Sequence, residues 1–598
     1  MKYRFIIIIF FLNILFLHVG FAQKPTEKYK LAQSFEKGGD LKNAERIYRE
    51  LYDANPSNED YFNAVIRCNK QLNQFQEIIP VVEKQIRLVP SSMNIALLAE
   101  LNWRTGKTKE ANDLWQKALE SNESDEKTYE DVAMSQVNLR LWPKAIATYQ
   151  LGRTKLNNNQ VFSNQLSQLY SITGDYKNGI AEVMNLYSIT HNIQYVQGRI
   201  AAMNQTKEAE LYIYQILEKN ADGGQIENLR LFAWYLTTIG KYEEAFQKTK
   251  VIDGALHMRG NEVFNFATTM QRDGKYNIAI KAYEYLIDMG RESQFTVNAL
   301  YGLTRSLELS QSDSNILKQQ DAESIISRYR KIAKEYPQST LAEDSRFRIA
   351  VIYYNLQNYT SALDELNQIL NTKNYIRIIP ASMNLASKIY IETDDLIKAE
   401  DNFRYVVRNY KNLNESEYIN ALYGLAKLNY FKGNIDSAIA LFTDITVMTS
   451  SDDANDALEK ISNIEQFKKY NKGFELFLKA ELKNEQKKYD DAVSMYIESA
   501  NAASNSELSE KAYIAASEIE AARKHFSKAR EFLQQMLLQN QESLNGDYIL
   551  YHVGKYYVAE GNKADAMIKF NELLAKYPRS IYLNPAREII QQIRPKAN

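Results

Sequence analysis

A period of about 34 residues runs through this chain and restricts the folds that it can adopt. In each copy an anchor residue, usually small, follows a polar turn by five positions, and an aromatic or aliphatic residue follows four positions later, as in Gly39, Ala44 and Tyr48. The anchors are spaced by 34, 33, 34 and 34 residues, and later by 34 again; they are Ala44, Ile78, Ala111, Ala145 and Gly179, then Ala245 and Ala279. One repeat of this length accommodates two antiparallel helices. The period therefore predicts an all-α chain of stacked helix pairs.

The second half of the chain keeps the pattern but not the strict period. The next clear anchors are Ala362, Ala399, Ala438, Ala492, Ala529 and Ala566. The long gap before Ala362 predicts one further repeat with an insertion within Leu309–Gln320, and the gap before Ala492 predicts an extra helix within Ser450–Gln466. We expect about 14–15 helix pairs. We divide the chain into an amino-terminal signal, residues 1–22, and three parts of the repeat array. These are an N-terminal part at 23–220, a central part with an insertion at 225–320, and a C-terminal part at 321–598.

Two segments carry the repeat most completely. In Asp547–Pro578, Gly554 and Tyr557 occupy the small and aromatic positions of a first helix, and Ala566 and Phe570 occupy those of a second. Glu27–Pro56 shows nearly the same arrangement. With these residues the chain resembles the tetratricopeptide repeat family over nearly all of its length. The resemblance implies a right-handed α-solenoid whose work is to bind other proteins or peptides.

A narrower resemblance concerns the junctions Tyr336-Pro337-Gln338-Ser339 and Tyr577-Pro578-Arg579-Ser580. They are similar to junctions in bacterial envelope repeat proteins, namely the Tol–Pal-associated coordinator and the repeat lipoprotein of the outer-membrane assembly machine. This chain lacks the cysteine that would anchor the latter. Proline directly after a helix also has a simpler explanation, because it cannot continue one.

The first 22 residues have the organisation of an export signal. Lys2 and Arg4 precede the apolar run Phe5–Leu17, and Gly20-Phe21-Ala22 supplies small residues at the positions that a signal peptidase recognises. We expect cleavage after Ala22; the alternative is an uncleaved membrane anchor. Because Cys68 is the only cysteine, no intramolecular disulfide can form. We therefore expect the protein in the periplasm or at the cell surface of a Gram-negative-type bacterium.

The composition and motifs indicate no catalysis and no nucleic-acid binding. The 73 basic and 74 acidic residues leave a net charge of −1, which gives no general attraction to nucleic acid or anionic lipid. Outside the signal the four histidines His191, His257, His525 and His552 fall in different repeats, and no nucleophile, phosphate-loop or zinc motif is complete. We expect no enzyme activity, no cofactor and no metal site.

What remains is surface for binding. A solenoid of helix pairs lines its concave face with first helices. Several aromatic and basic residues fall there at helical spacing, which indicates a tyrosine-rich groove for a partner segment; they are Phe347, Tyr354, Tyr423, Lys427, Tyr430, Tyr551 and Lys555. The alternative is packing between neighbouring first helices.

These features predict an exported scaffold or adaptor that binds envelope proteins, with outer-membrane association through its partners. The alternative functions are a component of a surface secretion or motility apparatus and a helical accessory of a cell-wall hydrolase.

Overall fold

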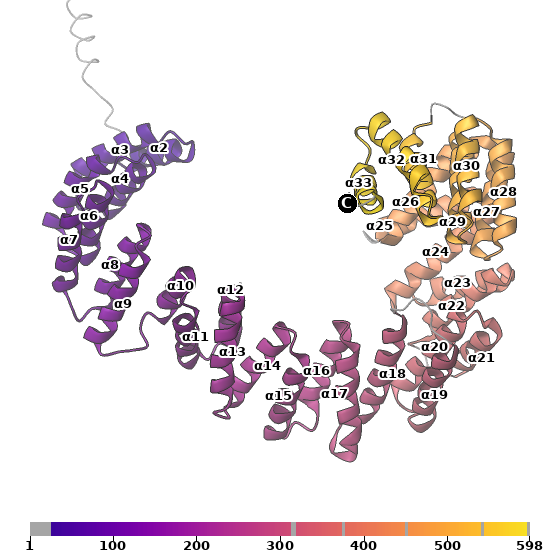
Figure 1. Ribbon diagram of the computed structural model, residues 1–598, viewed down its shortest axis with the longest axis horizontal. Coiled ribbons are helices and arrows are strands. Elements are labelled where there is room, and N and C mark those ends of the chain that lie inside the picture. Colours follow the sequence, from indigo (N-terminus) through magenta and orange to yellow (C-terminus); the bar gives the residue numbers. More distant parts are fainter. Residues whose placement is uncertain (1–24, 313–318, 373–376, 449–451, 540–542, 595–598) are drawn as a thin grey trace, which may run out of the picture. The chain divides into compact units, whose positions relative to one another are not determined.

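The computed structural model describes residues 25–312, 319–372, 377–448, 452–539 and 543–594. In these ranges the chain forms 32 α-helices and two short 3₁₀ helices, with no strand (Figure 1). The fold is the predicted all-α array of repeats. The predicted export signal, residues 1–22, lies outside the described residues. Among the residues described, no helix combines the length and the apolar character needed to cross a membrane.

The chain divides into two compact units, residues 1–258 and 259–598. The first unit contains seven helix pairs: α2 (Pro25–Lys37) with α3 (Leu41–Ala54), α4 (Glu59–Gln71) with α5 (Phe75–Leu88), α6 (Ser92–Arg104) with α7 (Thr108–Ser121), α8 (Glu126–Asn138) with α9 (Trp142–Leu156), α10 (Ser163–Thr173) with α11 (Tyr176–Thr190), α12 (Ile193–Met203) with α13 (Lys207–Ala221), and α14 (Ile226–Thr238) with α15 (Tyr242–Ala255).

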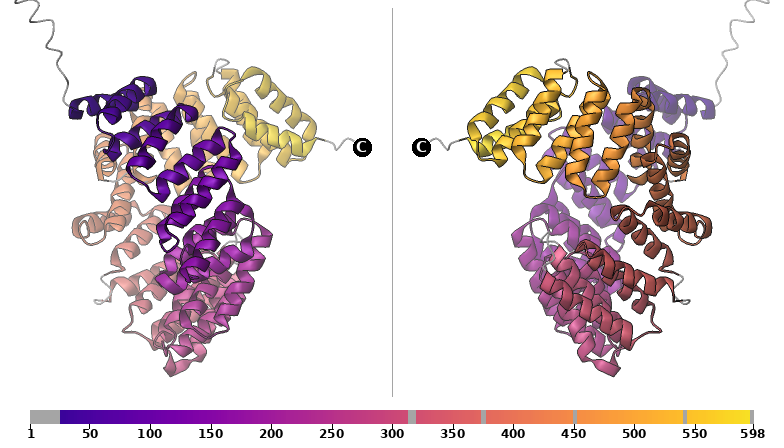
Figure 2. Two further views of the ribbon diagram at one scale, coloured as in Figure 1. Left: turned by 90° about the vertical axis from the view of Figure 1, so that its left-hand side faces the viewer. Right: turned by 90° about the vertical axis from the view of Figure 1, so that its right-hand side faces the viewer.

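The second unit contains eight pairs and two single helices. The pairs are α16 (Asn261–Arg272) with α17 (Tyr276–Asp288), α18 (Thr296–Ser312) with α19 (Gln319–Glu335), α20 (Thr340–Asn355) with α21 (Tyr359–Leu370), α22 (Ile379–Glu392) with α23 (Leu396–Asn409), α24 (Glu415–Phe431) with α25 (Ile435–Met448), α27 (Lys472–Glu485) with α28 (Tyr489–Ala502), α29 (Glu507–Ala522) with α30 (Phe526–Gln539), and α31 (Gly546–Ala559) with α32 (Lys563–Lys576). The single helices are α26 (Asp452–Phe467) and α33 (Leu583–Ile593), and the 3₁₀ helices are η1 (Gly290–Glu292) and η2 (Lys468–Tyr470). Figure 2 shows α27 to α32, in orange and yellow, as antiparallel pairs stacked on one another.

The anchor residues explain why these sequences pack as pairs. In fourteen of the fifteen pairs the anchor is the fourth residue of the second helix, and the alanine and isoleucine anchors have no exposed surface. A small side chain at this point lets the two helices of a pair approach closely. The structure also supplies the anchor that the sequence pattern missed, Ala322 in α19. The exception is Ala209, the third residue of α13.

The turn inside each pair is equally regular. In thirteen pairs the residue two positions before the second helix has a positive φ, for example 85° at Gly106 and 58° at Arg140. Glycine adopts this left-handed conformation without strain, which explains why glycine stands at this position in several turns, such as Gly39, Gly106, Gly274 and Gly561.

The irregular half of the repeat array is resolved in part. The predicted extra helix is confirmed as α26, between the pairs α24–α25 and α27–α28. The predicted insertion within Leu309–Gln320 lies where α18 ends and α19 begins, and residues 313–318 of it are outside the described ranges. The number of pairs, fifteen, agrees with the expected count. The division into residues 23–220, 225–320 and 321–598 stays a prediction.

Candidate functional site

Four of the seven predicted groove residues line one pocket in the second unit. Phe347 and Tyr354 come from α20, and Tyr423 and Lys427 come from α24. The first helix of the intervening pair, α22, lies between them and supplies the middle of the lining. The pocket has a volume of about 540 Å³. Residues that were selected by their helical spacing in two different repeats therefore share one surface.

The pocket repeats one pattern across three helices. Counted back from the left-handed residue of each turn, position −10 holds Phe347, Asn384 and Tyr423 in α20, α22 and α24. Position −6 holds Val351, Lys388 and Lys427, and position −3 holds Tyr354, Ile391 and Tyr430. Eight of these nine residues line the pocket; Tyr430 does not. Residues at these positions face the same side of each first helix because they are three, four and seven residues apart.

The floor of the pocket is apolar and closely packed. Leu385 and Phe403 are buried, and Phe347 and Val351 are half-buried against the same cluster as Leu385. A Cβ atom at Gly424 would collide with the Phe403 ring. Glycine at this position of α24 therefore allows the Phe403 ring of α23 to pack directly against the helix. The result is a firm apolar surface that a partner side chain could cover.

Two residues of α22 that sequence analysis did not select add polar groups to this surface. The Nδ2 of Asn384 donates hydrogen bonds to the main-chain oxygen of Glu417, at 2.9 Å, and to its Oε2, at 2.7 Å. The Oδ1 of Asn384 is buried and has no hydrogen-bond partner within the described chain. Lys388, one turn later, is exposed and forms no ion pair with any described residue. Counting the repeat positions through α22 would have found both.

The turn between α27 and α28 contacts the end of α22, next to the pocket. Lys487 Nζ lies 2.8 Å from Glu392 Oε2, and the Tyr354 hydroxyl donates to Glu392 Oε1 at 2.5 Å. The Tyr359 hydroxyl also donates to Glu392. Alongside, Gln486 donates to Asp394 at 2.7 Å. Lys488 Nζ lies 3.1 Å from Asp394 Oδ2. We call this group the clasp; it consists of Glu392, Asp394, Gln486, Lys487 and Lys488 with Tyr354 and Tyr359.

The electrostatics of the clasp favour the ionised pair. Burial alone would raise the pKa of Glu392, but the hydrogen bonds from Lys487, Tyr354 and Tyr359 outweigh it and hold that pKa below 4.5. The pKa of Lys487 is raised, since its contacts with Glu392 and Tyr359 outweigh its burial. Both shifts have the sign expected for a pair that stays charged at neutral pH.

The placement of Tyr430 on an exposed groove was wrong. Tyr430 has no exposed surface, and its ring lies 6.3 Å from that of Phe474 in α27. Tyr430 and Tyr354 both stand at position −3, so the face of the helix that carries them was predicted correctly. The inserted helix α26 and the following α27 cover the last turn of α24, and Tyr430 consequently belongs to the core formed by these helices.

Tyr551 and Lys555 do not line this pocket. They occupy positions −10 and −6 in α31, and the Tyr551 ring stacks on Tyr582, with ring centroids 4.8 Å apart. Lys555 Nζ lies 5.4 Å from the centroid of the Tyr551 ring. Tyr582 immediately precedes α33, so the last helix partly covers the surface that an open array would expose here. The role of all these residues in binding a partner stays a prediction.

No group of three or more His, Cys, Asp and Glu in the described ranges is arranged to hold a metal ion. His525 Nδ1 lies 2.5 Å from Glu520 Oε2, and Glu520 also binds Arg523. His552 is a different case, because burial and then Lys555 lower its pKa to about 4. Neither histidine is placed beside a hydrogen-bonded nucleophile among the contacts of the described chain.

Comparison with known proteins agrees with the repeat pattern. The family model for the tetratricopeptide repeat matches residues 28–58, 344–372 and 548–580. The second match covers most of α20 and α21, which carry one side of the pocket. A search of curated proteins finds no relative of the sequence.

Solved structures of helical repeat proteins resemble the chain at low identity. They include Naa15/Naa10 bound to HypK (13% identity, TM-score 0.31, 96% of each chain covered) and yeast Tom70 (12%, TM-score 0.31, 75% of this chain and 96% of that one). A tetratricopeptide repeat protein from Parabacteroides merdae is a third (13%, TM-score 0.26, 56% of this chain and 99% of that one). Likenesses of this degree carry no argument about function.

Proposed function

Because this chain carries tetratricopeptide repeats, we propose that it is an exported, non-enzymatic scaffold that binds partner proteins in the bacterial cell envelope and serves the assembly of envelope or outer-membrane complexes. The observation that carries the proposal is the pocket across α20, α22 and α24. Repeat proteins of this kind bind partners along surfaces built from successive first helices. The pocket combines such a surface with polar groups that have no partner within the described chain.

The lining indicates how a partner segment would bind. The apolar floor made by Phe347, Leu385 and Phe403 suits an apolar side chain of the partner. The free Oδ1 of Asn384 would accept a hydrogen bond from a main-chain N–H of the segment. Lys388 would attract an acidic residue nearby and so favour one orientation of the segment. An extended peptide supplies all three groups within a few residues.

The proposed location rests on the first 22 residues. The basic start, the apolar run Phe5–Leu17 and the small residues Gly20 and Ala22 support export. Mass spectrometry of the protein purified from its host tests this directly, because export with cleavage leaves Gln23 as the first residue. A soluble protein that retains Met1–Ala22 would contradict the proposal.

Partner binding is tested by photo-crosslinking in intact cells. A photoreactive phenylalanine in place of Lys388 should crosslink a defined protein, whereas the same residue in place of Ile397, which is exposed on α23 outside the pocket, should not. Ala381→Trp, which fills the pocket, should abolish the crosslink, and Ile397→Trp serves as the matched control. Equal crosslinking from positions 388 and 397 would count against the pocket as the binding surface.

A further inference from the structure

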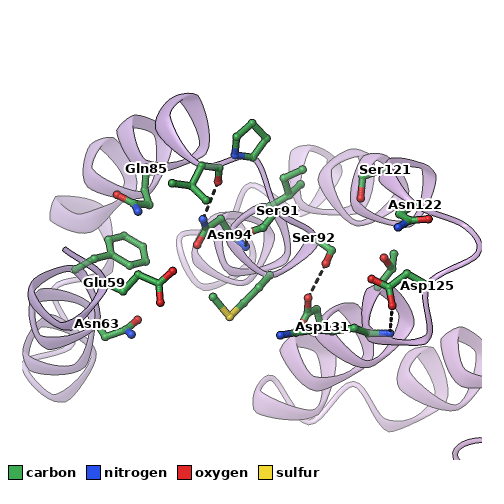
Figure 3. Close-up of a pocket in the computed structure, with 17 residues that line it drawn as sticks. Glu59, Asn63, Gln85, Ser91, Ser92, Asn94, Ser121, Asn122, Asp125 and Asp131 are labelled. Atoms are coloured by element: carbon green, nitrogen blue, oxygen red, sulfur yellow. Dashed lines mark hydrogen bonds between the residues drawn. The ribbon is translucent and has the colours of Figure 1, made fainter. Parts of the chain in front are cut away.

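A second pocket, in the first unit, lies where three first helices begin. It has a volume of about 610 Å³ and is lined by the starts of α4, α6 and α8 together with the ends of α5 and α7 (Figure 3). None of its residues contributes to the pocket proposed above, and sequence analysis selected none of them. Its chemistry is different, because acceptors dominate its lining.

The lining carries three carboxylates and one ammonium group. Glu59, Asp125 and Asp131 come from α4, the cap of α8 and the second turn of α8, and Lys127 is the single basic residue. Within the described chain none of the three carboxylates takes part in an ion pair. Asp131 is half-buried and accepts a hydrogen bond from the Ser92 hydroxyl at 2.6 Å. With three carboxylates and one lysine in the lining, the pocket holds a surplus of negative charge.

The helix starts do not offset this charge with free donors. The side chains of Asn58, Ser91 and Asp125 cap α4, α6 and α8 and accept hydrogen bonds from the first-turn N–H groups. The main-chain donors that could attract an anion are thus already occupied in part. A ligand that fits here has to donate hydrogen bonds.

A buried acceptor at the centre of the pocket also favours a ligand that donates hydrogen bonds. Asn94 is 4% exposed, and its Nδ2 donates to the Val89 oxygen at 3.1 Å, which sets the orientation of the amide. Its Oδ1 is buried and has no hydrogen-bond partner among the residues that the structure describes. In Figure 3 the Asn94 side chain lies between Glu59 and Asp131. A buried oxygen without a donor costs free energy, and a bound donor would recover it.

The remaining lining is apolar and partly open. Met93 is 48% exposed and Val89 is 42% exposed, and the buried rings and chains of Phe62 and Ile95 lie beside them. Long basic side chains have this dual character, because an aliphatic stem carries a charged head. The carboxylates are too scattered for a metal ion, since the described residues contain no metal-holding cluster.

We propose that this pocket binds an arginine or lysine side chain of an extended segment in a partner protein. The stem packs on Met93 and Val89, and the charged head donates hydrogen bonds to Asn94 Oδ1 and to the carboxylates of Glu59 and Asp131. Charge complementarity selects this occupant, because an acidic segment would be repelled and a neutral one would leave the negative charge of the pocket unbalanced.

The binding test uses the full mature chain and two synthetic peptides. One has the sequence acetyl-Gly-Ser-Ala-Arg-Ala-Ser-Gly-amide, and in the other citrulline replaces arginine, which removes the charge at nearly equal shape. Saturation-transfer NMR measures both affinities. We expect the arginine peptide to bind about tenfold more tightly, the factor typical of a charged hydrogen bond. Equal affinity of the two peptides would overturn the proposal, as would equal affinity of the arginine peptide and free arginine amide.

Variants locate the binding. Glu59→Gln with Asp131→Asn should weaken arginine-peptide binding about tenfold. Glu110→Gln with Asp113→Asn makes the same change of charge on the exposed side of α7 and should change binding by less than about twofold. Equal losses in both variants would show a general charge effect and overturn the site. The pocket in the second unit is untouched by these variants, so failure here leaves the proposed function to its own test.

Discussion

Lys487 Nζ lies 2.8 Å from Glu392 Oε2, although Glu392 ends α22 and Lys487 lies in the turn after α27, with a whole helix pair and an extra helix between them. Many ion pairs of the described chain lie within one helix, such as Arg49 with Glu45, and others join neighbouring helices, such as Lys28 with Glu50. This one instead ties the α27–α28 turn back to the end of α22. The tie is possible because α26 interrupts the regular stacking. The ion pair of Lys487 with Glu392 lies close to the pocket, where Glu485 at the end of α27 forms an ion pair with Lys427 at 2.8 Å.

Removing the carboxylate of the clasp should loosen α27 and α28. Glu392→Ala leaves Lys487 and two tyrosine hydroxyls without their shared acceptor, so we expect a loss of about 1–3 kcal/mol in local stability. Hydrogen exchange of the amides near residues 486–488 measures it. Lys207→Ala removes a pair whose lysine is 91% exposed and should cost no more than about 0.5 kcal/mol. Equal effects of the two changes would refute the structural role of the clasp.

The low pKa of the Glu392 carboxyl predicts a loss of folding stability in acid. The pKa of Glu392 is lower in the folded chain than its ordinary value of 4.5, so its contribution is complete above pH 4.5 and declines as the pH falls through the folded pKa. Thermal unfolding between pH 7 and pH 3 should show this decline. In Glu392→Gln the decline should be shallower, because glutamine does not titrate. An unchanged slope would mean that other carboxylates dominate the acid response.

The two tyrosines of α24 should behave differently when truncated. Tyr430 is fully buried, so Tyr430→Ala should cost about 3–5 kcal/mol. Tyr423 is half-buried at the pocket wall, and its ring contacts Phe442 with centroids 5.6 Å apart. Tyr423→Ala should therefore cost distinctly less and should weaken partner capture. Urea unfolding of both variants, followed by fluorescence, distinguishes them. A larger loss for Tyr423→Ala would reverse our assignment of core and surface.

Two neighbouring turns offer a matched test of backbone strain. Gly106 and Arg140 hold the same left-handed position, with φ of 85° and 58°. Gly106→Ala should destabilise the first unit by about 1–2 kcal/mol, because a Cβ atom is unfavourable there. Arg140→Gly relieves the same strain and should be neutral or stabilising by up to about 1 kcal/mol. Melting temperatures that change in the same direction for both variants would contradict this explanation.

Much of the architecture could be predicted from local pattern. The anchor alanines, the left-handed turns and the extra helix α26 all follow from interactions within one repeat, between residues fewer than about 40 positions apart. Such contacts depend on residue size and helical spacing, which the sequence displays directly. Ala209 and Ala322 were harder to place, because in their repeats the turn lacks the glycine and the spacing changes.

The candidate site could be predicted only in part. Phe347, Tyr354, Tyr423 and Lys427 have the spacing that brings them to one surface, and the structure joins them in one pocket. Asn384 and Lys388 were overlooked because α22 has no aromatic residue at the three repeat positions, so its first-helix face lacked the tyrosine pattern seen in α20 and α24. The pocket at the starts of α4, α6 and α8 had no signal at all, since caps and exposed carboxylates are ordinary features of helices.

The helix pairs, their number and the faces of the first helices can be derived from the sequence, because each repeat carries its own helical spacing and its own turn. Which of those faces stay accessible depends on packing between repeats, which the structure shows. Tyr354 and Tyr430 hold equivalent positions, yet one lines a pocket and the other is buried. The difference arises from α27, which covers the end of α24 and is held by contacts such as Lys487 with Glu392. Contacts between distant repeats cannot be recognised from the repeat period, because each of them occurs once in the chain.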